Sequence, residues 1–103
     1  MYVIIWEYRV STVGAAEFQA IYAPTGAWAQ LFSRARGHLG TELLNDPGEP
    51  ERYMTIDRWS SREAYDFFLA DSGDQYAELD AYCGTLTSRE TELGKLTSIH
   101  PGG

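Results

Sequence analysis

Basic residues are few in this sequence. The chain of 103 residues has 8 lysines and arginines against 15 acidic residues, and its formal net charge is −7. A module that binds nucleic acid needs a basic face to neutralise phosphates, and no cluster of lysine and arginine is present. The same shortage disfavours binding to anionic membrane surfaces. We therefore expect neither nucleic acid nor a membrane among its partners.

Cysteine and histidine are also scarce. Cys83 is the single cysteine, and the only histidines are His38 and His100. This set allows no intramolecular disulfide and no Cys/His zinc site, and it gives no basis for a Ser-His-Asp triad. His38 follows a glycine at the start of a strand, where a structural histidine is the commoner outcome. Cys83 has helical spacing from Leu79 and Leu86, which favours buried packing over a nucleophile.

Long apolar runs and glycine-rich binding loops are missing too. No segment approaches the ~20 apolar residues that span a bilayer, and the first ten residues lack the basic start and long apolar stretch of a signal peptide. The sequence contains no phosphate-cradling glycine loop and no nicotinamide-binding fingerprint. We expect a cytoplasmic protein.

Aromatic residues, by contrast, are abundant at 14%, with three tryptophans and seven tyrosines. Core filling accounts for most of them, but aromatic rings also line pockets for flat organic ligands. The length fits one domain, which we place at residues 1–99, followed by a tail at 100–103.

Four strands and two interrupted helices are predicted from the hydrophobic spacing. Strands are expected at 3–10, 38–45, 52–59 and about 89–99, with a long hairpin loop at 46–51. Helical spacing begins at Ala15, is broken near 23–26 by Pro24 and Gly26, and stops at Gly37. Ser60 and Glu63 predict a capping box for a second helix, with a break at 71–73.

This order predicts an α+β fold of the ferredoxin-like β-α-β-β-α-β type. The simplest packing is a four-stranded antiparallel sheet with both helices on one face. The other face would be bare and apolar, and pairing two sheets in a homodimer would cover it. We assign Ile4, Trp6, Tyr8, Val10, Met54 and Ile56 to that dimer face. The alternative is a monomer in which these residues face the helices.

The helix-facing side would then carry polar residues among apolar ones: Val3, Ile5, Glu7, Arg9, Tyr53, Thr55, Asp57 and Trp59. Buried charges need partners, or their pKa values shift. One interpretation is a structural ion pair of Arg9 with Glu7 or Asp57. The other is a polar-lined pocket beneath the interrupted helices, suited to an aromatic ligand.

Two segments carry a family resemblance: residues 37–43, GHLGTEL, and residues 53–65, YMTIDRWSSREAY. Together with the strand order they resemble the antibiotic biosynthesis monooxygenase family, over roughly residues 2–94. The resemblance implies a dimeric α+β barrel in which each subunit has its own pocket. Some members of the family oxygenate polycyclic phenols with no metal or flavin, the substrate itself reducing oxygen, whereas others degrade haem.

The resemblance also implies candidate site residues. Trp59 and Tyr65 match pocket aromatics of the oxygenating members, and Thr55 stands where those members have an asparagine. The haem-degrading members have an asparagine in the first strand and a histidine in the second helix. This chain has Glu7 in the first strand and no histidine in the second helix, so haem degradation is not expected.

Our leading hypothesis is a cofactor-independent monooxygenase acting on a small aromatic phenol or hydroquinone. Glu7 or Asp57 would be the general base, and Arg9 would stabilise the anion. Substrate-binding walls would come from Trp59, Tyr65, Thr55, Tyr22 and Trp28. The alternatives are a non-catalytic dimeric module that binds a small molecule, and an isomerase or cyclase that uses the same carboxylate without oxygen.

Overall fold

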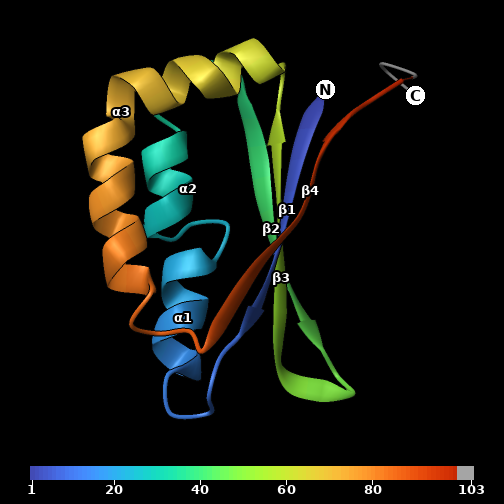
Figure 1. Cartoon of the computed structure of the whole chain (residues 1–103), viewed down its shortest axis with the longest axis vertical. Coiled ribbons are helices and arrows are strands. Elements are labelled where there is room, and N and C mark those ends of the chain that lie inside the picture. Colours follow the sequence, from blue (N-terminus) through green and yellow to red (C-terminus); the bar gives the residue numbers. More distant parts are fainter. Residues whose placement is uncertain (100–103) are drawn as a thin grey trace.

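The computed structural model describes residues 1–99, and the predicted tail at 100–103 lies outside the described residues. The elements are β1 (Tyr2–Arg9), α1 (Ala15–Tyr22), α2 (Ala27–Phe32), β2 (His38–Asp46), β3 (Glu49–Trp59), α3 (Arg62–Cys83) and β4 (Arg89–Thr97). The strands form one antiparallel sheet in the order β2-β3-β1-β4. All the helices lie against one face of it (Figure 1). The predicted α+β class and element order are confirmed.

The first helix is broken where Pro24 and Gly26 predict it, leaving α1 and α2 as separate segments. Gly26 is tightly enclosed: a Cβ atom there would lie 2.3 Å from the carbonyl oxygen of Ala20. Any larger residue would therefore push the two segments apart. The end of α2 was predicted too late, because the helix stops at Phe32 and a turn leads to Gly37, whose φ is +91°.

The β2–β3 hairpin is longer, and its loop shorter, than predicted. The strands extend to Asp46 and from Glu49, so only Pro47 and Gly48 lie between them. The Asp46 side chain accepts a hydrogen bond from the Gly48 amide at 2.8 Å. Such a local bond closes a tight turn, which lets the flanking residues join the sheet.

The cap of helix α3 lies one residue later than the predicted cap at Ser60. Ser61 is the N-cap, and its hydroxyl accepts from the Ala64 amide at 3.1 Å. The predicted interruption at 71–73 is a kink at Ser72, where φ is −119° and ψ is 21°. Figure 1 shows α3 turning sharply there, so that its first part crosses the end of the sheet and its second part runs beside α1 and α2.

The register of the sheet reverses the predicted faces of β1. Trp6 lies opposite Thr55 and Tyr8 opposite Tyr53, so these four residues share the helix-facing side. Glu7 pairs instead with Met54 on the open side. The prediction that Glu7 and Arg9 face the helices is therefore wrong. Alternation fixes which residues of one strand share a face, but both faces of β1 are apolar, so it could not fix the phase of β1 against β3.

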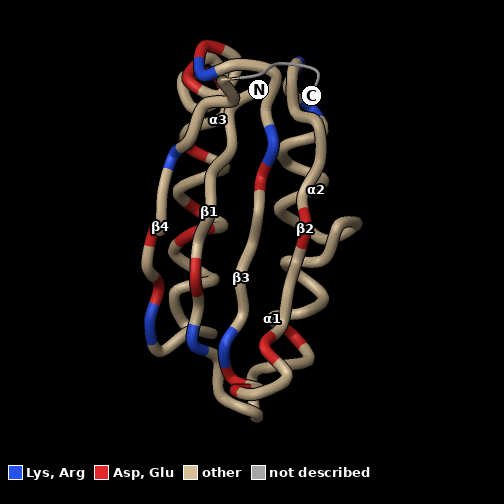
Figure 2. Tube along the Cα trace, turned by 90° about the vertical axis from the view of Figure 1, so that its right-hand side faces the viewer, with Lys and Arg blue, Asp and Glu red and all other residues tan. Residues whose placement is uncertain are grey.

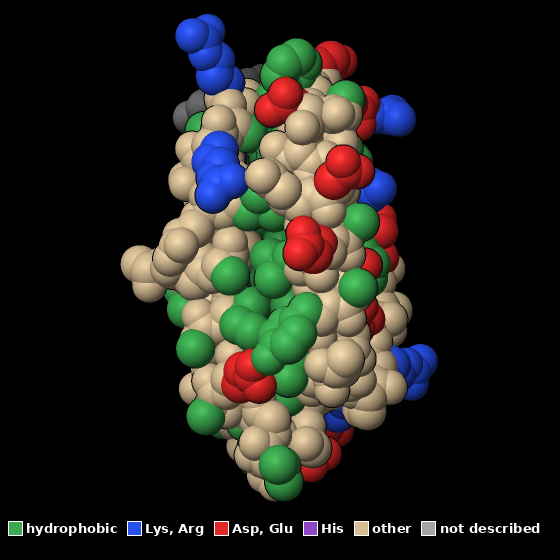
Figure 3. Space-filling view, turned by 90° about the vertical axis from the view of Figure 1, so that its left-hand side faces the viewer, with side chains coloured by type: hydrophobic (Ala, Val, Ile, Leu, Met, Phe, Trp, Pro, Cys, Tyr) green, Lys and Arg blue, Asp and Glu red, His purple; other side chains and the backbone are tan. Residues whose placement is uncertain are grey.

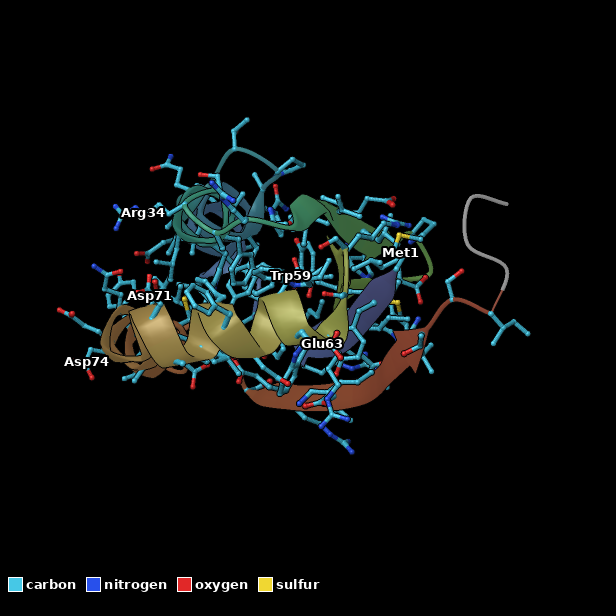
Figure 4. The ribbon with its side chains drawn as sticks, turned by 90° about the horizontal axis from the view of Figure 1, so that it is seen from above. Met1, Arg34, Trp59, Glu63, Asp71 and Asp74 are labelled. Carbon is cyan, nitrogen blue, oxygen red and sulfur yellow. The ribbon has the colours of Figure 1, made fainter. Side chains whose placement is uncertain are left out.

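The core lies between the sheet and the helices. Its largest fully buried side chains are Trp59, Phe18, Phe68, Val10 and Cys83. Figure 4 looks along this layer: Trp59 lies between the sheet and the helices, whereas Arg34, Asp71 and Asp74 lie on the outer side. In residues 1–99, no helix has both the length and the apolar character needed to cross a membrane.

Candidate functional site

A cavity opens between the sheet and the helices. Its enclosed volume is about 40 Å³, and the volume is about 470 Å³ when the space of its open mouth is included. Strands β1 to β4 and all three helical elements contribute to its wall. The lining is mainly aromatic with a few polar groups: Trp6, Tyr8, Tyr22, Trp28, Phe32, Thr41, Thr55, Asp57, Tyr76, Asp80 and Glu90. An aromatic cavity with few polar groups is typical of a site for a small organic molecule.

Asp57 is the buried acid of this cavity. It lies in β3, directly opposite Thr41 of β2 and Ile4 of β1, and is only 9% exposed. The Thr41 hydroxyl donates a hydrogen bond of 2.7 Å to Asp57 Oδ1. Burial raises the pKa of Asp57 to about 6, although the bond from Thr41 lowers it in part. A carboxyl group with this pKa can exchange a proton near neutral pH.

The polar chain continues from Asp57 to His38. His38 Nε2 lies 3.2 Å from the Thr41 hydroxyl oxygen. The imidazole packs against the rings of Phe32 and Trp59, with centroids 5.2 and 5.0 Å away. His38 is half-buried, and this burial lowers its pKa. A hydrogen-bonded path therefore leads from the cavity floor to a partly exposed side chain on the edge strand.

Three tyrosines of the wall remain protonated at neutral pH, because burial raises the pKa of Tyr8, Tyr22 and Tyr76. The ring centroids of Tyr8 and Tyr22 are 5.0 Å apart. Thr55 is 2% exposed, and its hydroxyl lies 3.4 Å from the Tyr8 hydroxyl. These groups present neutral hydroxyls rather than charges to a ligand.

Trp28 contributes its ring to the wall. The residue is 7% exposed and lines the cavity. Its Nε1 atom is covered and lies near the Tyr22 hydroxyl and the Cys83 thiol. The ring rather than the N–H therefore borders the cavity.

The charged lining is acidic. Asp80 and Glu90 are the exposed acids of the cavity, and none of its described lining residues is basic. Burial raises the pKa of Glu90, and the nearby Asp80 carboxylate raises it further. In Figure 3, apolar side chains follow the groove between the helical segments, with acidic side chains beside it. Within residues 1–99, no group of three or more His, Cys, Asp or Glu is arranged to hold a metal ion.

The structure brings together four of the predicted site residues and separates the other four. Those that line the cavity are Asp57, Thr55, Tyr22 and Trp28. Trp59 and Tyr65 lie behind the wall, where their ring centroids are 5.3 Å apart. Glu7 and Arg9 lie on the open face of the sheet: Glu7 pairs with Arg52 at 2.8 Å and Arg9 with Glu49 at 2.7 Å. Position therefore gives Glu7 no support as a base.

Sequence reasoning missed Trp6 and Tyr8, because it assigned their face of β1 to a dimer interface. It also missed Thr41, although Thr41 lies within the family-like segment and faces Asp57 across the strand pair. Tyr76 and Asp80 have a helical spacing of four residues, which could have placed them together. Nothing in the local pattern of β4 marks Glu90.

Comparison with known proteins agrees with this arrangement. A family model described as antibiotic biosynthesis monooxygenase matches residues 1–76. The crystal structure of a mutant of SnoaB, a cofactor-independent oxygenase from Streptomyces nogalater, is similar to the structure of this chain. Its TM-score is 0.78 and its sequence identity is 21%, over 96% of this chain and 93% of that chain. No curated protein matches.

Two further structures share the fold. A putative antibiotic biosynthesis monooxygenase from Nitrosomonas europaea has a TM-score of 0.74 and 15% identity, over 97% of this chain and all of that chain. One from Deinococcus radiodurans has a TM-score of 0.68 and 21% identity, over the full length of both chains. At these identities the likeness concerns the fold, whereas the family match extends over most of the sequence. The chain therefore belongs to the antibiotic biosynthesis monooxygenase family.

Proposed function

We propose that this protein is a cofactor-independent monooxygenase for a small, electron-rich phenol or hydroquinone, with Asp57 as the general base. The observation that carries the proposal is the buried carboxyl of Asp57 in an aromatic cavity, with its pKa raised to about 6. Family membership and the likeness to an oxygenase from Streptomyces nogalater support the same chemistry.

The first step is removal of the phenolic proton. Asp57 Oδ1 already accepts from Thr41, so its other carboxylate oxygen is free to take the substrate proton. The resulting phenolate is far easier to oxidise than the neutral phenol. It transfers an electron to molecular oxygen, and the two radicals combine to form a C–O bond at a ring carbon. Loss of the hydrogen on that carbon and cleavage of the O–O bond then give a quinone carbonyl, and the second oxygen atom leaves as water. The substrate supplies all the electrons, so the balance requires no separate reductant.

Stabilisation of the phenolate must come from neutral donors. Arg9, the group predicted for this role, lies on the other side of the sheet, and no described lining residue carries a positive charge. Tyr8 and Tyr22 line the same cavity, and burial raises the pKa of both, so their hydroxyls are neutral donors. Fixed donors of this kind stabilise a developing oxyanion more effectively in a water-poor cavity than in bulk water.

We also propose that the protein is a homodimer formed through the open face of its sheet. This face combines partly exposed apolar side chains of Val3, Ile5, Met54 and Ile56 with ion pairs such as Arg58–Glu42 at 2.5 Å. Figure 2 looks onto it and shows basic residues only toward the strand ends. No helix covers this face (Figure 1), and a two-fold pairing of sheets would bury its apolar middle.

The test is oxygen consumption by metal-stripped protein with a panel of naphthols, hydroquinones and anthrone-like phenols. We expect uptake without added metal or flavin, with kcat/KM rising through pH 6 as Asp57 ionises. Asp57→Asn should remove this activity and Glu7→Gln should not. Turnover that continues without oxygen would indicate an isomerase or cyclase, and tight binding without turnover would indicate a binding module.

A further inference from the structure

The proposed chemistry leaves a proton in a buried place. Asp57 is only 9% exposed, so once protonated it needs a route by which the proton can leave before the next turnover. The hydrogen-bonded chain from Asp57 through Thr41 to His38 is such a route. Its two separations are 2.7 Å and 3.2 Å, and it ends at a half-buried side chain of edge strand β2.

We propose that Thr41 and His38 form a proton relay that returns Asp57 to its carboxylate form during turnover. The proposal rests on Asp57 being the base of the proposed function, and it adds roles for two residues that do not themselves act on the substrate. Thr41 carries the proton, and His38 passes it to water.

In the relay step, the bonds broken and formed balance over Asp57, Thr41 and His38. The protonated Asp57 carboxyl turns about its Cβ–Cγ bond so that its O–H faces Thr41, and it gives its proton to the Thr41 oxygen while the Thr41 hydroxyl proton moves to His38 Nε2. One O–H bond of Asp57 is broken and one N–H bond of His38 is formed, and Thr41 ends with the single proton it began with. The imidazolium then gives one proton to water and becomes neutral.

The residue types fit this task. A threonine hydroxyl is both donor and acceptor. Thr41 can therefore donate to Asp57 and accept from His38, or accept from Asp57 and donate to His38. The ring packing of His38 against Phe32 and Trp59 fixes Nε2 toward Thr41. Burial raises the pKa of Asp57 to about 6 and lowers that of His38, so at both ends of the path burial favours the neutral form.

Other groups around the cavity are poorer acceptors for this proton. The buried tyrosines keep their own protons because burial raises each pKa. The exposed acids lie on α3 and β4, and no hydrogen bond joins either of them to Asp57 among the described residues. The other titratable groups that line the cavity with Asp57 are Tyr8, Tyr22, Tyr76, Asp80 and Glu90.

The kinetic test compares Thr41→Val, Thr41→Ser and His38→Ala. Removing the hydroxyl or the imidazole should lower kcat by roughly ten-fold or more while KM stays within about two-fold, since His38 lies outside the cavity lining and valine has nearly the same shape as Thr41. Thr41→Ser should recover most of the loss, and added imidazole should restore His38→Ala. Thr12→Val is the control: Thr12 lies in an exposed loop, so its substitution should leave kcat and KM unchanged.

A second measurement needs no turnover. NMR titration of His38 should show an inflection coupled to Asp57, and this inflection should disappear in Asp57→Asn and in Thr41→Val. Thr41→Ser should keep it. Coupling that is present in the wild type and lost in Asp57→Asn and Thr41→Val, together with a wild-type protein that consumes no oxygen, would refute the oxygenase but not the proton path. Uncoupled titration in the wild type, or full activity of His38→Ala with an unchanged pH profile, would overturn the relay.

Discussion

Replacing Asp57 with asparagine should stabilise the protein while removing the proposed base. Burial raises the Asp57 pKa from 3.8 to about 6, so between these values the native state holds a proton that the unfolded chain has released. The free energy of unfolding therefore falls as pH rises across this window and stays lower above it. A shift of about two units corresponds to at most about 3 kcal/mol.

Asparagine has nearly the same shape, and its Oδ1 can still accept from Thr41, but it carries no charge to desolvate. At pH 8 we expect Asp57→Asn to raise the free energy of unfolding by about 2–3 kcal/mol, and near pH 4 by less than about 1 kcal/mol. Urea titration followed by tryptophan fluorescence at both pH values measures the difference.

The control is Asp66→Asn, which removes an exposed carboxylate paired with Arg62 at 3.6 Å. Exposed pairs of this kind contribute about 0.3–0.5 kcal/mol, so this variant should change little at either pH. If Asp57→Asn had the same effect at pH 4 and pH 8, or destabilised the protein at pH 8, the assignment of Asp57 as a desolvated acid would be wrong.

The remaining predictions concern the cavity, the helix break and the open face. Trp28→Leu should weaken binding of a naphthol by roughly ten-fold, measured by calorimetry, because an aromatic wall of the cavity is lost; unchanged affinity would remove Trp28 from the site. A naphthol with an added carboxylate should bind at least about ten-fold more weakly than its uncharged amide in a fluorescence titration, since the lining is acidic; equal affinities would contradict this. Gly26→Ala should destabilise the fold by about 1–3 kcal/mol in thermal melts, because its Cβ would meet backbone oxygens, whereas Gly73→Ala has open space. Ile56→Asp should convert the proposed dimer to a monomer in analytical ultracentrifugation, while Gln75→Asp on α3 should not.

The element order could be predicted from the sequence, because the residues that end each helix and strand act locally. Pro24 and Gly26 are sufficient to end a helix, and the alternation of β3 identifies Thr55, Asp57 and Trp59 as one face. The hairpin loop was harder to predict, since the side-chain bond from Asp46 that tightens it is a matter of geometry rather than composition.

The site was only partly predictable for the same reason. Asp57, Tyr22 and Trp28 were found because each lies on an element whose buried face follows from its own spacing, and Thr55 was found through the family resemblance. The phase of β1 depends on its pairing with β3 and β4, where a register shift falls between Ile5 and Trp6. A shift of one residue in the pairing of β1 therefore decides whether Glu7 or Trp6 reaches the cavity. The spacing of residues within a single strand contains no information about this shift.

The break at Gly26 has a consequence for how this scaffold can diversify. The offset between α1 and α2 is set by backbone contacts at a glycine, not by the side chains that face the ligand. The rings that line the cavity come from β1, α1, α2 and α3, so each can be exchanged without moving the helix break that sets the spacing of α1 and α2. A library that keeps Gly26 and varies Trp6, Tyr22, Phe32 and Tyr76 would therefore explore new substrates on a constant frame.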